Sequence, residues 1–192
     1  MPAGGPCRAR ADADDDGRVS DVEVREVSRI DDDLRAAMRA CWIDVTNAGG
    51  AVGFVPPVTE ADVEPALEHL VTGVHERGDV LVVLTVDGEL AGFAGLVRSG
   101  HVLKGHWATV LRVQVHPSRQ GAGLGRVLME GVHEVAHRNG LEFVHLTVRG
   151  GTGTQAFYDG LGYREVGRIP GALRVGPGDD RDETYMWLDL RP

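Results

Sequence analysis

The sequence predicts an α/β domain in which one mixed β-sheet carries helices on both of its faces. Segments with alternating or continuous apolar residues, typical of strands, are separated by segments with apolar residues at helical spacing. A strand-like segment also runs through a glycine-rich stretch directly into a long helix-like segment, a junction typical of α/β architectures. The expected order is strand, two helices, three strands, helix, strand, helix and two strands, about seven strands in a single layer.

The composition indicates a single soluble globular domain. The chain has 192 residues, of which 42% are hydrophobic and 26% are charged, as in ordinary globular proteins. Residues 1–20 contain little that could be buried, so we expect a disordered leader there and one domain over residues 21–192. The formal net charge of −9 argues against a nucleic-acid partner and is compatible with a cationic amine substrate.

The same sequence argues against a membrane, secreted or metal-binding protein. No apolar run approaches the roughly 20 residues that span a bilayer, and no apolar stretch follows the N-terminal charges as in a secretory signal. Cys7 falls in the expected leader and Cys41 in an expected helix, which favours neither a disulfide nor a metal site. We therefore expect a cytoplasmic protein with no membrane partner and no metal.

The first half of the chain predicts one strand and two helices. Alternating apolar and charged residues predict a strand over 22–27, and helical spacing predicts a helix from Asp31 to about Asn47. The segment 49–54, Gly-Gly-Ala-Val-Gly-Phe, interrupts that pattern. Thr59 with Asp62 three residues later forms a capping box, which predicts a second helix to about Arg77.

The second half predicts the rest of the sheet. A continuous apolar run over 80–86, an Asp-Gly turn and a second run over 90–97 predict a hairpin. Further strands are predicted over 108–116, 143–148, 163–166 and 184–190. Helices are predicted over 124–139, where Gly140 ends the helix, and over 154–161. Residues 176–183 are expected to form an acidic loop.

The strongest chemical signal is the junction between the strand that ends at His116 and the helix that begins at Leu124. Glycines at a helix start leave backbone N–H groups free and let a phosphate approach the main chain closely. Arg119 and Arg126 flank this stretch. A dinucleotide fingerprint would need a small residue where Arg126 stands, and an ATPase-type loop would need a Lys-Ser or Lys-Thr pair. A glycine-rich entry turn without a ligand is the alternative.

Two separated motifs resemble those of the GNAT superfamily of N-acetyltransferases. Gln120, Gly123 and Gly125 occupy the positions of its Gln/Arg-x-x-Gly-x-Gly/Ala signature. The segment 156–163, Ala-Phe-Tyr-Asp-Gly-Leu-Gly-Tyr, is similar to its Phe-Tyr-x-x-x-Gly-Phe element and is followed by Glu-Val-Gly at 165–167. The first half of the chain matches the superfamily only in its pattern of elements.

The resemblance implies a GNAT-like fold and an enzyme that moves an acetyl group from acetyl-CoA to a primary amine by direct attack in a ternary complex. It implies that the backbone of the fourth strand pairs with the pantetheine arm and that the glycine-rich loop holds the pyrophosphate. The residues so implied are Val113, Gln114, Val115, Gln120, Gly121, Ala122, Gly123, Leu124, Gly125 and Arg126. Tyr158 occupies the position whose phenol donates a proton to the sulfur of coenzyme A, and packing beside Phe157 is its alternative role.

The sequence leaves the general base open. A lysine-like amine with a pKa of about 10.4 is only about one part in 2,500 neutral at pH 7, a deficit of roughly 4.6 kcal/mol. Many family members place a carboxylate on the fourth strand, where this chain offers only Arg112 and Gln114. His106, His145 or a water molecule are the remaining candidates.

The acceptor is expected to be a small-molecule amine. Residues 49–54, together with Arg-Ile-Pro-Gly-Ala at 168–172, resemble a branch that contains the tabtoxin-resistance acetyltransferases. On this view 49–54 lines a compact pocket, with the acidic loop 176–183 over its mouth; a tight packing turn between helices is the alternative. A lysine or N-terminal protein acetyltransferase and a non-catalytic acyl-CoA-binding module are the alternative functions. The assembly is expected to be a monomer or a homodimer.

Overall fold

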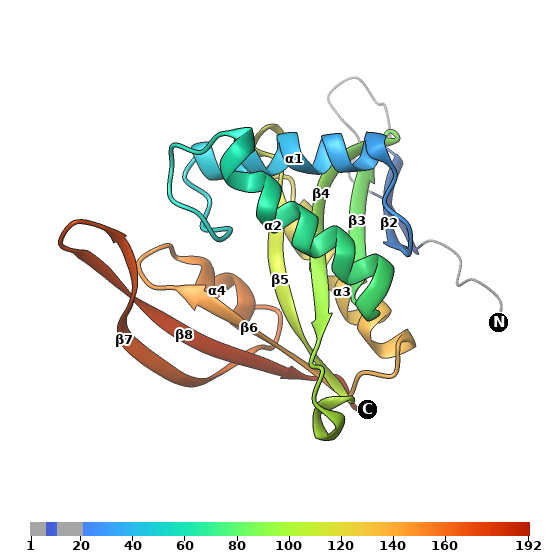
Figure 1. Ribbon diagram of the computed structural model, residues 1–192. Helices are drawn as coiled ribbons and strands as arrows, with labels where there is room; N and C mark the ends of the chain where they lie inside the picture. The colour runs from blue at the N-terminus through green and yellow to red at the C-terminus, as the bar shows by residue number, and fades with distance from the viewer. Residues whose placement is uncertain (1–6, 11–20) are drawn as a thin grey trace.

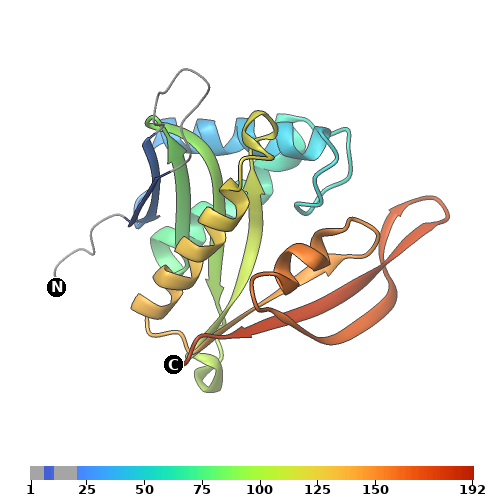
Figure 2. The same ribbon diagram turned by 180° about the vertical axis from the view of Figure 1, so that it is seen from behind.

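The computed structural model describes residues 7–10 and 21–192. Its centre is an eight-stranded sheet with the order β1-β2-β3-β4-β5-β6-β8-β7. Neighbouring strands are antiparallel except β5 and β6, which are parallel. Helices α1 and α2 lie on one face of the sheet and α3 crosses the other (Figures 1 and 2). The predicted single-layer α/β sheet with helices on both faces is confirmed.

The elements follow the predicted order. The strands are β1 (Cys7–Arg10), β2 (Asp21–Val27), β3 (Val80–Val86), β4 (Glu89–Arg98), β5 (Trp107–Val115), β6 (Phe143–Arg149), β7 (Arg164–Gly176) and β8 (Asp179–Asp189). The helices are α1 (Asp32–Asn47), α2 (Glu60–Thr72), α3 (Leu124–Arg138) and α4 (Thr154–Asp159). A π-helical turn over Gly73–Arg77 extends α2, so the helical segment ends where the sequence predicted.

Local signals explain the helix starts and the hairpin. The Asp31 side chain accepts a hydrogen bond from the backbone N–H of Leu34 at 2.8 Å and so caps α1. Thr59 and Asp62 form the capping box of α2. Asp87 and Gly88 both have positive φ, 52° and 83°, as a type I′ turn between β3 and β4 requires.

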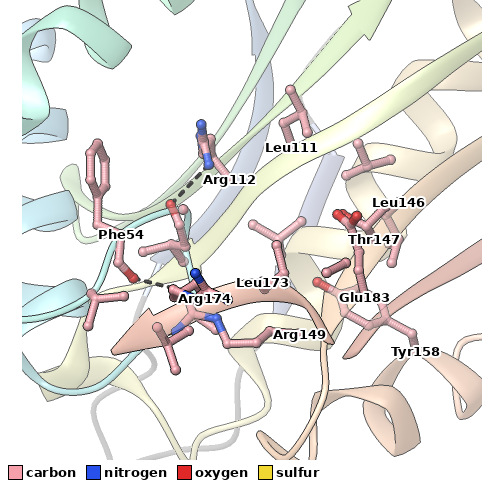
Figure 3. A pocket seen from close by; sticks show the side chains of 18 residues that line it. Phe54, Leu111, Arg112, Leu146, Thr147, Arg149, Tyr158, Leu173, Arg174 and Glu183 are labelled. Atoms are coloured by element: carbon pink, nitrogen blue, oxygen red, sulfur yellow. Dashed lines mark hydrogen bonds between the residues drawn. The ribbon is translucent and has the colours of Figure 1, made fainter. Parts of the chain in front are cut away.

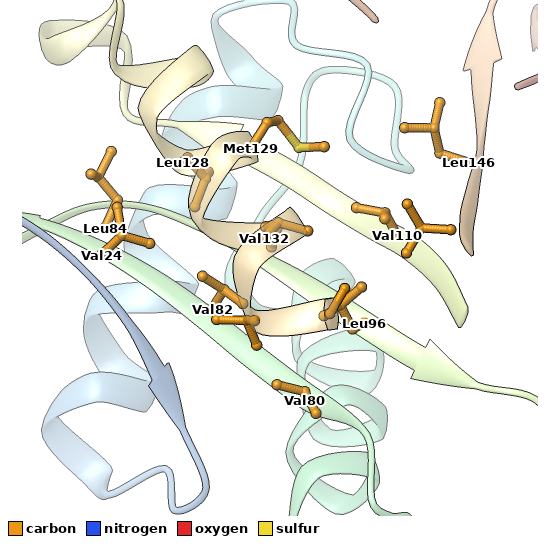
Figure 4. Close-up of a cluster of buried hydrophobic side chains, with 14 of the residues drawn as sticks. Val24, Val80, Val82, Leu84, Leu96, Val110, Leu128, Met129, Val132 and Leu146 are labelled. Carbon is orange, nitrogen blue, oxygen red and sulfur yellow. The ribbon is translucent and has the colours of Figure 1, made fainter. Parts of the chain in front are cut away.

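The strand β3 organises two hydrophobic cores. Its side chains alternate between the faces: Val80, Val82 and Leu84 join the core under α3, while Leu81 and Val83 join the core under α1 and α2. This explains the continuous apolar run, since a strand that is covered on both faces has no polar side. Figure 4 shows the first core, in which Leu128, Met129 and Val132 of α3 lie over the strands.

Two expectations near the chain ends are corrected. Residues 7–10, expected within the disordered leader, form β1 antiparallel to β2; the rest of that leader lies outside the described residues. An edge strand pairs through main-chain hydrogen bonds, so the polar composition of this segment did not predict the strand. The short strand 163–166 and the loop 176–183 are instead one long hairpin, β7 and β8, that turns at residues 177–178.

The hairpin was missed because β7 has no hydrophobic alternation. It is an edge strand, largely exposed, with three register shifts against β8. Pro170 is tolerated at such an edge. The three aspartates of the expected loop lie on β8 and pair with arginines: Asp179 with Arg181, Asp180 with Arg174, and Asp182 with Arg168.

The close approach of α3 to the sheet generates a stability prediction. A Cβ atom at Gly131 would lie 2.3 Å from a methyl carbon of Val24, so Gly131→Ala forces this packed interface apart. We expect a loss of about 1–3 kcal/mol of unfolding free energy from overpacking, only partly offset by the roughly 1 kcal/mol that alanine gains in a helix. Urea denaturation measures it. The double variant with Val24→Ala should be more stable than the sum of the single effects predicts; a stabilised Gly131→Ala protein would contradict the contact.

Candidate active site

The site begins where two parallel strands separate. β5 and β6 pair only through Trp107–Thr109 and Phe143–His145. Beyond these residues the strands diverge, and β6 leaves with the β7–β8 hairpin while β5 continues beside β4 (Figure 1). The edge of β5 that would have faced β6 is therefore open in the described structure, and it lines two adjoining cavities.

The larger cavity has a volume of about 610 Å³. It is enclosed by residues 51–55, residues 110–113 of β5, part of β6, residues 172–175 of β7, Glu183 and Tyr158. Figure 3 shows Thr147, Glu183 and Tyr158 on one side and Phe54 on the other.

The smaller cavity, of about 350 Å³, reaches from there toward the glycine loop at 120–125. Its walls include residues 48–52, residues 113–115 of β5 and Gln120. The two cavities share six lining residues: Ala51, Val52, Val113, Thr147, Arg149 and Tyr158. They are therefore adjoining ends of one passage.

A β-bulge shapes β5 at the cavity wall. Leu111 pairs with Gly95 and Gln114 with Phe93, so Arg112 and Val113 together stand opposite Ala94. Arg112 takes up the extra residue with φ 56°, a left-handed conformation that a non-glycine residue adopts at a cost. Bulges of this kind re-aim side chains and are frequent beside active sites.

The loop over residues 48–58, which follows α1, forms the roof of both cavities and is tied down at its carbonyls. The Val52 carbonyl accepts hydrogen bonds from Trp42 Nε1 at 3.1 Å and from Arg112 at 3.3 Å. The Phe54 carbonyl accepts one from Arg149 at 2.9 Å. Of the predicted segment 49–54, residues 51–54 line the larger cavity and residues 49–52 the smaller one. That the segment binds an amine stays a prediction. Trp42, which the helical pattern did not single out, supports this loop.

The glycines of this loop have packing roles as well. A Cβ atom at Gly53, whose φ is 103°, would lie within 1.8 Å of the Arg112 guanidinium, and one at Gly50 would lie 2.6 Å from Val45. Asn47 closes the loop by accepting from the Val58 N–H at 2.8 Å and donating to its carbonyl at 3.1 Å. Gly50 and Gly53 also line the smaller and the larger cavity, respectively. The same residues therefore serve both as cavity wall and as packing turn.

The glycine loop presents free backbone donors. The N–H groups of residues 121–125 donate to no acceptor in the described part of the chain, and Gly121 and Gly123 have φ values of 84° and 75°. The Gln120 side chain donates to the Val115 carbonyl at 2.8 Å and so joins the loop to the end of β5. These donors at the start of α3 suit a phosphate group.

The flanking side chains contribute less. Leu124 is buried in the core, so only its backbone faces the loop. Arg126 donates to the Gly160 carbonyl at 3.2 Å, and Arg119 lies 3.5 Å from Glu89. Both arginine side chains thus have partners outside residues 120–125.

Gln114 adds a donor and an acceptor in the smaller cavity. The residue is 3% exposed, and neither atom of its carboxamide has a hydrogen-bond partner in the described structure. A buried polar group without a partner is destabilising. Because Gln114 also lines the smaller cavity, the arrangement fits a ligand whose chain carries amide groups, as the pantetheine arm of coenzyme A does.

Tyr158 lies on α4 at the junction of the cavities. Its ring makes edge contacts with Phe157 and Tyr163, at centroid distances of 5.1 and 5.6 Å. Its hydroxyl has no hydrogen-bond partner in the described structure, and burial raises the pKa of Tyr158 to about 12. The phenol therefore stays protonated at neutral pH and is able to donate.

Neither histidine proposed as a base lines either cavity. His106 packs edge-on against Phe143, while the His145 ring bonds the hydroxyl of Thr109 at 2.7 Å. Burial, with the charge of Lys104, lowers the pKa of His145. Both histidines lie at the end where β5 and β6 are still paired, away from the point of divergence.

The carboxylate that sequence reasoning missed is Glu183. Among the described residues it is the one acidic residue that lines the larger cavity, and it accepts a hydrogen bond from the Tyr185 hydroxyl at 3.0 Å. It stands opposite Arg149 in the β6–β8 ladder. Only that long-range pairing brings it to the site, and no local pattern in the sequence distinguished it from the other acidic residues of its segment.

None of the described helices combines the length and apolar character needed to cross a bilayer. No cluster of three or more potential metal ligands occurs in the same part of the chain.

Comparison with known proteins identifies the family. The model of the acetyltransferase (GNAT) family matches residues 53–163, more than half of the chain. A structure from Salmonella typhimurium described as an acetyltransferase, solved with its cofactor acetyl-CoA, has a TM-score of 0.68 at 20% identity and covers 88% of this chain and 94% of its own.

Two other similar structures differ in their named acceptors. One assigned as a phosphinothricin N-acetyltransferase has a TM-score of 0.73 at 17% identity, covering 89% of this chain and 99% of its own. The ribosomal-protein-S18-alanine N-acetyltransferase of Escherichia coli has a TM-score of 0.64 at 21% identity, covering 88% and 95%. At these identities the likeness establishes the shared fold. The chain belongs to the GNAT family of acetyltransferases, enzymes that take their acetyl group from acetyl-CoA.

Proposed function

We propose that this acetyltransferase acts on a compact primary amine, which occupies the larger cavity while the donor occupies the smaller one. The observation that carries the proposal is the pair of adjoining cavities with Tyr158 in the wall of both. An amine in one cavity would attack a thioester that enters from the other, with both substrates bound together.

The 48–58 loop favours a small acceptor over a peptide. Two arginines and a tryptophan bind its carbonyls, so the roof of the larger cavity is braced against the sheet. On the opposite side residues 172–175 of β7 narrow the space. A peptide acceptor would need an open groove across this region, and the braced loop and β7 occupy it. A lysine or N-terminal protein acetyltransferase is therefore the second candidate function.

The donor would be held by the residues that the family resemblance implied. The free N–H groups of 121–125 would bind the pyrophosphate, and the main chain of 113–115 with the Gln114 carboxamide would bind the amide-bearing arm. When bound, acetyl-CoA supplies an acetyl thioester. The chain then has two tasks: to remove a proton from the amine and to return one to sulfur.

Glu183 is suited to the first task and Tyr158 to the second. A carboxylate held by Tyr185 would take one proton from the ammonium, directly or through a water, and leave a neutral nucleophile. As the new C–N bond forms and the C–S bond breaks, Tyr158 would give its proton to the departing sulfur. The nitrogen would lose its second proton in the same stage, and that proton would return to Tyr158 directly or through a water, so that an amide and a free thiol are left. Its raised pKa keeps that proton available throughout the neutral range.

The substrate class is tested with acetyl-CoA and a panel of small primary amines and peptides, with release of free thiol as the readout. We expect small amines to be acetylated faster than any peptide. A peptide that exceeds every small amine would favour the protein acetyltransferase. Tight acetyl-CoA binding without acetylation of any amine or peptide would favour a non-catalytic acyl-CoA-binding module.

Gly123→Ala should weaken coenzyme A binding. Gly123 and Gly140 both have positive φ, 75° and 71°, and a Cβ atom at either would meet nothing within 4 Å. They stand at opposite ends of α3, so both alanine variants should lose a similar 1–2 kcal/mol from backbone strain. Only Gly123→Ala should also lose the thermal shift produced by coenzyme A. Equal shifts in the two variants would remove the loop from the binding site.

Tyr158→Phe should lower kcat by about 10²-fold with little change in the KM for acetyl-CoA, because the lost proton donor acts in the transition state. Tyr163→Phe is the matched control, since it removes a hydroxyl that bonds His133 outside both cavities. An unchanged kcat in Tyr158→Phe, with chemistry rate-limiting, would assign Tyr158 a packing role only.

Glu183→Gln should lower kcat/KM strongly at pH 7 and progressively less toward pH 10. Near the amine's own pKa of about 10.4, about half of the substrate arrives neutral and needs no base, against about one part in 2,500 at pH 7. The pH profile of wild type and variant measures this convergence. Glu165→Gln, which changes an exposed carboxylate paired with Arg168 on β7, is the control. A loss of activity that is constant with pH would indicate that Glu183 has only a structural role.

A further inference from the structure

Two arginines in the larger cavity lack a counter-ion. Arg112 and Arg149 both line it, and in the described part of the chain each guanidinium donates only to a loop carbonyl. The third arginine of the lining, Arg174, differs because Asp180 binds it through two hydrogen bonds of 2.8 and 3.0 Å. Each unpaired guanidinium has five N–H donors, so most of its donors remain available.

The position of Arg112 is costly for a residue that only supports a loop. Burial disfavours its charge and lowers the pKa of Arg112, and a buried charge is normally paired with an opposite one. The backbone adopts positive φ at this residue, and Gly53 must lack a side chain to admit the guanidinium. The Val52 carbonyl already has a neutral donor in Trp42, so anchoring alone does not require the cation.

The guanidinium of Arg112 is also preoriented. It lies over the Trp42 ring, 5.2 Å from the centroid, which fixes its plane through a cation–π interaction. Arg149 comes from the other diverging strand and, although it stands opposite Glu183 in the ladder, forms no ion pair with it. Within the described part of the chain, the cavity lining thus includes two unpaired cations, from β5 and β6, and one carboxylate, from β8.

We propose that Arg112 and Arg149 form an anion subsite for the acceptor, so that the substrate is a compact amine that also carries a carboxylate, phosphonate or phosphinate. This rests on the proposed function. The acid group binds the two guanidiniums, while the amine lies toward Glu183 and Tyr158. The acceptor is then zwitterionic like an amino acid, rather than the simple cation that the net charge of −9 would attract.

The test uses acceptors matched in their carbon frame. L-leucine is compared with L-leucinamide and isoamylamine, and L-methionine with 3-(methylthio)propylamine; 2-aminoethylphosphonate represents phosphonates. Binding is measured by calorimetry with coenzyme A present, and kcat/KM is measured with acetyl-CoA. The acid-bearing member of each matched pair should bind and react at least about tenfold better, as expected for a hydrogen bond between charged groups.

The decisive variant is Arg149→Gln, because Trp42 and Arg112 still hold the loop at Val52. It should reduce kcat/KM for the preferred acid-bearing amine by about 10- to 100-fold, with little effect on its uncharged partner, and Arg149→Lys should recover part of the loss. Arg174→Gln is the control, since that arginine lines the same cavity with its charge already paired. Arg112→Gln should show the same selectivity for the acid group.

Five results would overturn the subsite. Equal losses with acid-bearing and uncharged amines would mean that Arg149 only anchors the loop. A loss of coenzyme A affinity in Arg149→Gln would assign its charge to the donor's phosphates. Absence of any preference for acid-bearing amines in binding would also exclude the subsite. If amines are acetylated rapidly without such a preference, the subsite alone is refuted. If the protein binds coenzyme A but neither binds nor acetylates any amine, the proposed function is refuted as well.

Discussion

The separation of β5 from β6 after three paired residues is the constraint on which the rest of the structure depends. A parallel pair that continued would have consumed the main-chain groups along that edge of β5. Because β6 instead turns away with β7 and β8, the middle of the sheet carries an opening whose walls are strands. Strands β5, β6, β7 and β8 therefore provide much of the lining, and the 48–58 loop and Tyr158 of α4 complete it.

The loop that covers this opening is supported by arginine side chains. The 48–58 loop crosses the gap between the helical half of the molecule and the diverging strands, and its carbonyls are bound by one arginine from each strand. Backbone carbonyls in such a position need donors. Long side chains with several donors serve here, because they reach a carbonyl and still present further N–H groups to the cavity.

Charge is distributed differently in the site and over the whole chain. The chain as a whole is strongly acidic, and most acidic residues of the β7–β8 hairpin are neutralised by neighbouring arginines. Inside the larger cavity the balance is reversed, with more arginines than carboxylates. The local lining decides what binds there, since fixed charges close to a ligand act at short range and with little screening.

The sequence by itself determined the order of the elements, most of their boundaries, the family and the glycine loop, because helix caps, turn residues, apolar periodicity and the Gln120–Gly125 spacing are local signals. The tertiary structure alone decided the rest. Glu183 reaches the cavity through its register against β6, and Arg112 through a bulge defined against β4. The length of β7 depends on pairing along an exposed edge that needs no hydrophobic pattern. These contacts join residues far apart in the chain, and no local periodicity records them.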